Sequence, residues 1–101
     1  MSRPPTPELT VRTDDHGRYI LEGELDKASV PWLMQQPRPA APDGVRVDLA
    51  GIRRVDSAGL ACLLDWLRTT REGGVDLTFE NVPDQLIAIA EVSGVRDILA
   101  L

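Results

Sequence analysis

The side chains best suited to chemistry are two neighbours, Asp56 and Ser57, which precede a run of residues typical of a helix. A serine in the first turn of a helix faces backbone N–H groups without intrahelical partners and the positive end of the helix dipole. There its hydroxyl can cap the helix, carry a phosphate or contact a partner protein. Asp56 is an equally good candidate for the cap. From these residues alone, Ser57 could have either a structural role as a helix cap or a functional role.

Nucleophilic catalysis by Ser57 would need residues that the sequence does not supply. A serine hydrolase requires a histidine base and an orienting acid, and many place the serine in a Gly-x-Ser-x-Gly turn. Here Val55 occupies the place of the first glycine, and the one histidine, His16, falls in a predicted turn far along the chain. We therefore expect no catalytic residues and no enzyme activity.

The sequence also predicts no cofactor and no metal. One cysteine, Cys62, and one histidine are too few for a structural zinc site, and the acidic pairs lack the spacing of a calcium loop. The sequence has no Gly-x-x-x-x-Gly-Lys loop for nucleotide phosphates. Nothing near Cys62 indicates an activated thiolate, so we interpret it as a small packing residue at an interface or the surface.

Composition narrows the class of partner. The chain has 101 residues, 43% hydrophobic and 27% charged, with a formal net charge of -5. The negative charge argues against nucleic acid, because its phosphates would be repelled. No apolar run approaches the ~18 residues that cross a bilayer, so we expect no direct membrane insertion. Residues 1–7 hold three prolines and are expected to form a disordered lead, followed by one cytoplasmic domain over residues 8–101.

Periodicity and turn residues predict the elements that position Ser57. Alternating apolar residues predict strands at residues 9–13, 18–23, 45–49 and 75–79. Helices are predicted over residues 57–72 and 83–93, with a short helix around Pro31 and another within residues 95–101. This order predicts an α/β fold: a mixed four-stranded sheet with an N-terminal hairpin, right-handed crossovers and helices packed on one face.

The predicted helix over residues 57–72 has two dissimilar faces. At 100° per residue the buried side receives the large apolar residues Leu60, Leu63, Leu64, Trp66 and Leu67. The outer side receives smaller or polar residues, namely Ser57, Ala58, Ala61, Cys62, Asp65, Arg68 and Thr69. Small residues beside a serine allow another backbone to approach closely, whereas a solvated face would be richer in Lys, Glu and Gln. We therefore predict that the outer side binds a partner protein.

The run VRVDLAGIRRVDSAGL at residues 45–60 resembles the core signature of STAS domains, the sulfate-transporter and anti-sigma-factor-antagonist family. The resemblance extends from the GELD run at residues 23–26 to about Leu99. It implies the STAS-like α/β fold. In antagonist-type members it also implies a phosphorylated serine or threonine at the centre of the partner interface. Ser57 occupies that position, with Asp56 beside it.

Two main roles within the family remain open. The short segment after the GELD run, the DSAGLACLLDWL helix and the tail over residues 86–99 resemble MlaB-like subunits of phospholipid ABC transporters. That resemblance implies docking on an MlaF-like ATPase subunit, and through it on a membrane permease at the inner membrane, in outer-membrane lipid asymmetry. The contacts it implies are Asp56, Ser57, Ala58, Ala61, Cys62, Asp65 and Arg68. MlaB-like proteins often have threonine at position 57, whereas serine is typical of antagonists, whose partner is an anti-sigma serine kinase.

Overall fold

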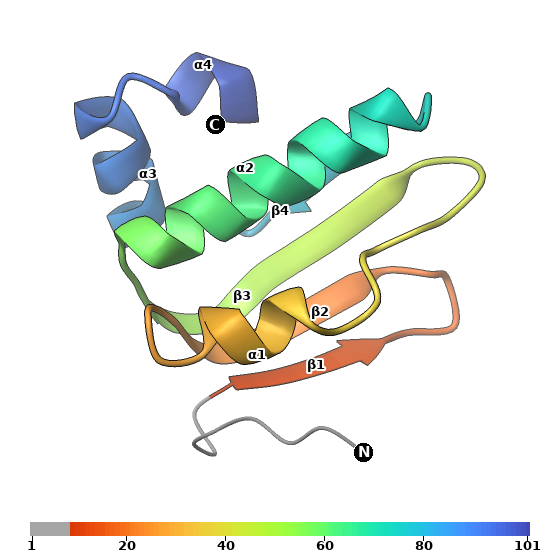
Figure 1. Cartoon of the computed structure of the whole chain (residues 1–101), viewed down its shortest axis with the longest axis horizontal. Coiled ribbons are helices and arrows are strands. Elements are labelled where there is room, and N and C mark those ends of the chain that lie inside the picture. The colour runs from red at the N-terminus through yellow and green to blue at the C-terminus, as the bar shows by residue number, and fades with distance from the viewer. Residues whose placement is uncertain (1–8) are drawn as a thin grey trace.

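Four strands form one mixed sheet in the computed structural model, which describes residues 9–101 (Figure 1). The strands are β1 (Leu9–Thr13), β2 (Tyr19–Leu25), β3 (Val45–Val55) and β4 (Leu77–Glu80), and they lie in that order across the sheet. β1 pairs antiparallel with β2, whereas β2–β3 and β3–β4 pair in parallel. The predicted mixed sheet with its N-terminal hairpin is confirmed. The lead predicted for residues 1–7 and the predicted domain start at residue 8 lie outside the described residues.

The hairpin turn between β1 and β2 is organised by Asp14. Its carboxylate accepts hydrogen bonds from the backbone N–H groups of Arg18 at 2.9 Å and His16 at 2.8 Å. The hydrogen bond from Arg18 is the main cause that lowers the pKa of Asp14; desolvation opposes it, and the weaker effect of the bond from His16 lowers the pKa further. Gly17 completes the turn in the left-handed region, with φ of 74°. His16 is exposed in this turn, as the sequence predicts.

Helices cover one face of the sheet (Figure 1). They are α1 (Val30–Met34), α2 (Ser57–Glu72), α3 (Asp84–Val92) and α4 (Arg96–Leu99). The core between the layers is mainly leucine and valine, since the chain has few aromatic residues. Trp66 of α2 is buried in it and meets the ring of Tyr19 edge-on, with 5.6 Å between ring centroids.

The other face of the sheet carries charged side chains. Arg12 on β1 pairs with Glu22 on β2, and Arg46 on β3 pairs with Glu80 on β4, at 3.2 and 3.0 Å. Exposed pairs of this kind contribute little to stability. We interpret this face as a solvated one, which leaves the helical layer to provide the packed core.

β3 is longer than predicted, because the strand continues past Leu49 to Val55. Two irregularities in its pairing with β2 each insert one extra residue into β3. The buried residues Leu49, Ile52 and Val55 consequently recur every three positions and not every two. The strict alternation of buried residues therefore stops at Leu49, which is where the predicted strand ends. The prediction for β4 was wrong by two residues at its start, where Val75 and Asp76 precede the strand, and β2 runs two residues further than predicted.

No helix within residues 9–101 combines the length and the apolar character that a bilayer crossing requires.

Candidate partner-binding site

Ser57 begins α2, but Asp56 caps it. Asp56 lies at the N-cap in an extended conformation, and its Oδ1 accepts hydrogen bonds from the backbone N–H groups of Ala58 at 2.9 Å and Gly59 at 3.1 Å. Ser57 is the first helical residue, and its side chain is exposed. Of the two candidates for the cap, the structure thus selects Asp56. The Ser57 hydroxyl is presented to solvent.

The loop after β2 lies against the start of α2. The backbone N–H of Lys27 donates to Oδ2 of Asp56 at 3.0 Å, and the backbone N–H of Asp56 donates to the carbonyl of Leu25 at 3.3 Å. Gly59 permits this approach, because a Cβ there would collide with the Leu25 carbonyl oxygen and with the side chain of Val55. The GELD and DSAGL runs, which α1 and β3 separate in the sequence, therefore form one end of the domain.

Asp26 and Ser29 hold that loop in place. The Asp26 carboxylate accepts hydrogen bonds from the backbone N–H groups of Ala28 and Ser29 at 3.0 and 3.2 Å. The Ser29 hydroxyl donates to the carbonyl of Glu24 at 2.8 Å and accepts from the N–H of Asp26 at 3.1 Å. Both side chains are buried. The sequence analysis did not predict this supporting role, although the GELD run was a signal for it.

Most of the predicted outer side of α2 is accessible. Ser57, Ala61 and Arg68 are exposed, whereas Ala58, Asp65 and Thr69 are half-buried. The prediction was wrong for Cys62, which is only 2% exposed, while Leu64, predicted to be buried, is half-buried. The prediction from the 100° spacing considered only the packing of α2 on the sheet. α1 also packs on α2, and the connector after α1 reaches Asp65 through Arg38, so the side of α2 bearing Cys62 is covered.

The burial of Cys62 also removes it from chemistry. Burial, with a smaller contribution from the nearby negative charge of Asp65, raises the pKa of the Cys62 thiol to about 12. A thiol with such a pKa is protonated at neutral pH and is a poor nucleophile. Cys62 is therefore a core residue and not part of the accessible surface.

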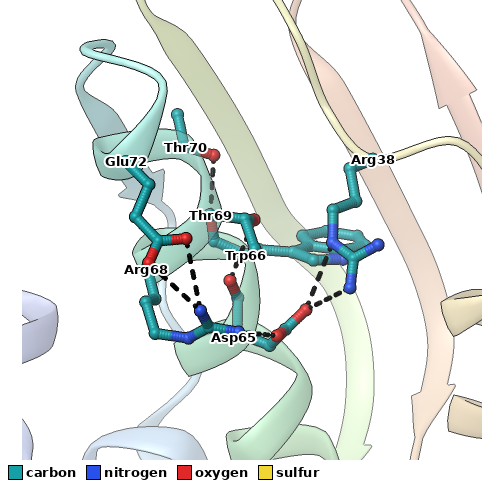
Figure 2. Close-up of polar contacts among 7 residues, drawn as sticks. All are labelled: Arg38, Asp65, Trp66, Arg68, Thr69, Thr70 and Glu72. Carbon is teal, nitrogen blue, oxygen red and sulfur yellow. Dashed lines mark hydrogen bonds and ion pairs between the residues drawn. The ribbon is translucent and has the colours of Figure 1, made fainter.

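Asp65 is the centre of an ion network on the outer side of α2 (Figure 2). Its Oδ2 accepts from Nη2 of Arg38 at 2.7 Å, and its Oδ1 accepts from Nη2 of Arg68 at 2.8 Å. Arg68 also contacts Glu72 at 3.2 Å. Partial burial raises the pKa of Asp65, but the hydrogen bonds from Arg38 and Arg68 outweigh it and leave this pKa below its usual value. The charges of Asp65 and Arg68 are therefore held in place by ion pairs within the domain, and we call these two residues the charged rim of the outer side of α2.

The polar groups along the outer side of α2 differ in how far the fold already engages them. Within residues 9–101, no three His, Cys, Asp or Glu side chains cluster as metal ligands would. The hydroxyls of Thr69 and Thr70 donate to carbonyl groups of the preceding turn, at 3.0 and 2.6 Å, and so belong to the helix itself (Figure 2). What remains is an exposed hydroxyl, small side chains and a charged rim, which together suit contact with a protein.

Comparison with known proteins identifies the family. The family model described as "Mlab, STAS domain" matches residues 9–100. The chain belongs to the STAS domain family. Similar curated proteins include the anti-sigma-B factor antagonist of Bacillus subtilis, 30% identical over 81 residues, which cover 78% of this chain and 74% of that protein. The anti-sigma-B factor antagonist of Staphylococcus aureus (strain NCTC 8325 / PS 47) is 30% identical over 97 residues, covering 90% of each chain.

Solved structures of STAS domains and sulfate-transporter proteins share the fold. A sulfate transporter family protein from Wolinella succinogenes superimposes with a TM-score of 0.66 at 15% identity, over 87% of this chain and 75% of that one. The STAS domain of an antisigma-factor antagonist from Rhodobacter sphaeroides superimposes with a TM-score of 0.57 at 22% identity, over 76% of this chain and 91% of that one. The structure of SLC26A9 superimposes with a TM-score of 0.67 at 18% identity, over 84% of this chain but only 17% of that one. These likenesses confirm the STAS-like fold that the VDSAGL run implied.

Proposed function

We propose that the chain is a non-catalytic docking subunit of a phospholipid-transporting ABC system. The observation that carries the proposal is the exposed Ser57 hydroxyl at the start of α2, beside an Asp56 carboxylate that the helix cap already engages. Ala58 and Ala61 follow it on the same side of the helix, so a partner backbone can approach the hydroxyl closely. The family model, whose description names Mlab, supports the transporter among STAS roles.

In this proposal the domain, residues 8–101, binds the cytoplasmic ATPase subunit and through it the membrane permease. Its contacts are Asp56, Ser57, Ala58, Ala61, Asp65 and Arg68. By binding one ATPase conformation better than another, it favours the assembled, active transporter. ATP hydrolysis and lipid movement belong to the partners, and the biological outcome is outer-membrane lipid asymmetry. The domain itself is cytoplasmic and peripheral to the inner membrane.

A second candidate is an anti-sigma-factor antagonist, which the 30% identity to two proteins of that name favours. An anti-sigma serine kinase would then phosphorylate Ser57. The helix N-terminus would stabilise the phosphate within the free domain. In a docked complex the phosphate would add about two negative charges next to Asp56 and weaken binding.

Substitutions of Ser57 test the proposal. Co-purification with the ATPase subunit is expected to fail for Ser57→Glu, because it places a charge in the interface, and to persist for Ser57→Thr, which keeps the hydroxyl. Thermal unfolding of both variants should match the wild type, since Ser57 is exposed and is not the cap. Wild-type co-purification and wild-type membrane integrity in cells carrying Ser57→Glu would remove Ser57 from the interface.

Ser57→Ala separates the two candidate functions. In a transporter subunit the lost hydroxyl contact weakens assembly with the ATPase. In a phospho-regulated antagonist the variant cannot be phosphorylated and binds its kinase partner constitutively. A pull-down of the wild-type chain from native membranes, analysed by mass spectrometry, gives the complementary result: ABC subunits support the first function and a small serine kinase the second.

A further inference from the structure

Two hollows lie along the side of α2 that bears Ser57. The first, the N-terminal hollow, is lined by Ser57 and by Ala88, Ile89, Val92 and Ser93 of α3 and its end. The second, the C-terminal hollow, is lined by α2 residues and by α4, including Ala61, Leu64, Leu67, Arg68, Arg71 and Ile98. On α2, Ser57, Ala61, Leu64 and Arg68 recur every three or four residues, so both hollows border one stripe of the helix. α3 lies beside the start of α2, and α4 follows α3 on the same side of the sheet (Figure 1).

Each hollow has an exposed apolar side chain in its wall. Val92 is 90% exposed and Ile98 is 52% exposed, and they are the exposed large hydrophobic residues of the part of the chain that the structure describes. A single exposed apolar residue is ordinary on a protein surface, but these two flank the same stripe of the same helix. A partner with apolar groups in both hollows would remove both side chains from water.

The charges around the two hollows differ. The residues that line the N-terminal hollow carry no charge. At the C-terminal hollow, Arg68 pairs with both Asp65 and Glu72, and Asp65 also pairs with Arg38. Arg71 is exposed and forms no ion pair with a carboxylate of residues 9–101. A complementary occupant therefore brings a negative charge to the Arg71 end and none to the Val92 end.

We propose that one amphipathic helix of the ATPase partner lies along this stripe, with an apolar side chain in each hollow and a carboxylate facing Arg71. The inference rests on the proposed docking function and names the partner segment. Ser57 and Leu64, one from each hollow, are about 10 Å apart along the helix axis at the 1.5 Å rise of an α-helix. Most of the other α2 residues that line the C-terminal hollow lie further from Ser57 along the helix, so a partner helix that follows α2 places its two anchors about two to three turns apart.

Photo-crosslinking in the co-purified complex tests this geometry. A photoreactive amino acid replaces Val92 in one variant and Ile98 in another, and the linked partner peptides are mapped by mass spectrometry. The expected result is that both positions link to one helix of the ATPase subunit, at sites about two to three helical turns apart. Links to separate segments of the partner, or an intact complex without links at either position, would overturn the proposal.

Charge substitutions give an independent measurement. We expect Val92→Glu and Ile98→Glu to weaken ATPase binding about tenfold or more, as for loss of an apolar anchor, and Arg71→Glu to weaken it as well. Thr78→Glu is the matched control, because it adds the same charge at an exposed position of β4. Melting temperatures verify that the variants fold. If Ser57→Glu abolishes binding while Val92→Glu and Ile98→Glu bind normally, docking at Ser57 is retained and a partner helix along the stripe is excluded. A wild-type chain that does not bind the ATPase would exclude both.

Discussion

At the scale of single residues, Asp56 determines the geometry that presents Ser57. Its carboxylate accepts three backbone hydrogen bonds, two from the first turn of α2 and one from Lys27. We expect Asp56→Ala to lower the free energy of unfolding by about 1–2 kcal/mol, as for loss of an N-cap. Urea denaturation measures this. Asp56→Asn is the control, since its amide oxygen still accepts a hydrogen bond and should lose less. Equal stability of Asp56→Ala and the wild type would contradict the capping role.

Gly59 is a second residue whose role the structure makes specific. Replacing an exposed glycine within a helix by alanine normally raises the free energy of unfolding. Gly59 is buried, however. Here the added methyl group would collide with the Leu25 carbonyl oxygen, so we expect Gly59→Ala to lower the free energy of unfolding by about 1–3 kcal/mol. Gly73→Ala is the matched control: its Cβ would lie 3.4 Å from the nearest atom, and the φ of Gly73, -82°, suits any residue. Thermal unfolding compares Gly59→Ala with Gly73→Ala. If Gly59→Ala is no less stable than Gly73→Ala, the end of β2 and the start of α2 are not in close contact.

At the scale of the element, the orientation of α2 determines which of its side chains are accessible. Leu63 is completely buried, whereas its neighbour Leu64 is half-buried at the rim of the C-terminal hollow. We expect Leu63→Ala to lower the free energy of unfolding by about 2–5 kcal/mol, as for a core leucine, and Leu64→Ala to lower it clearly less. Denaturant unfolding compares the two variants.

A third variant completes that comparison. Ala61→Arg should fold like the wild type but lose partner binding, because residue 61 is exposed on the same side as Ser57. If Leu64→Ala proves as destabilising as Leu63→Ala, or Ala61→Arg unfolds the protein, the orientation of α2 described above is incorrect.

At the scale of the whole molecule, carboxylates that accept hydrogen bonds make stability depend on pH. Hydrogen bonds from Asn81 and Ala50 lower the pKa of Asp48 below its usual 3.8, and those from Arg38 and Arg68 lower that of Asp65. A carboxyl group whose pKa is lower in the folded state stabilises the fold above its unfolded pKa and loses that contribution as pH falls through the folded pKa. We therefore expect stability to be flat from about pH 7 to 5 and to fall below about pH 4.

Urea midpoints at pH 5 and pH 3 measure this loss of stability. Asp65→Asn should lower the midpoint at pH 5 and reduce the difference between the two pH values, because the variant lacks a group that titrates in that range. Asp43→Asn, at an exposed position in the connector before β3, makes the same change of charge and serves as the control. An unchanged pH difference in Asp65→Asn would argue against a contribution from the network of Figure 2.

The sequence by itself determined the order of the elements, the bounds of α2, and the family. These are local properties: alternation forms the hairpin strands, Pro83 and Gly94 bracket α3, and the DSAGL run combines a cap, an exposed hydroxyl and a glycine in consecutive positions. Each follows from a few neighbouring residues, so each can be predicted without knowing what packs against it. The position of Ser57 at the start of an accessible helix belongs to this group.

The tertiary structure decided the rest, since it depended on contacts between distant segments. The length of β3 depends on two bulges against β2, which replace alternation with a spacing of three. The burial of Cys62 depends on α1 and the connector, which a helical wheel of α2 alone does not include. The same holds for Asp26 and Ser29, whose support of the site exists only once the loop after β2 meets the start of α2. Local propensity specified which residues form the helix, but only packing from several directions decided which of its sides remains accessible.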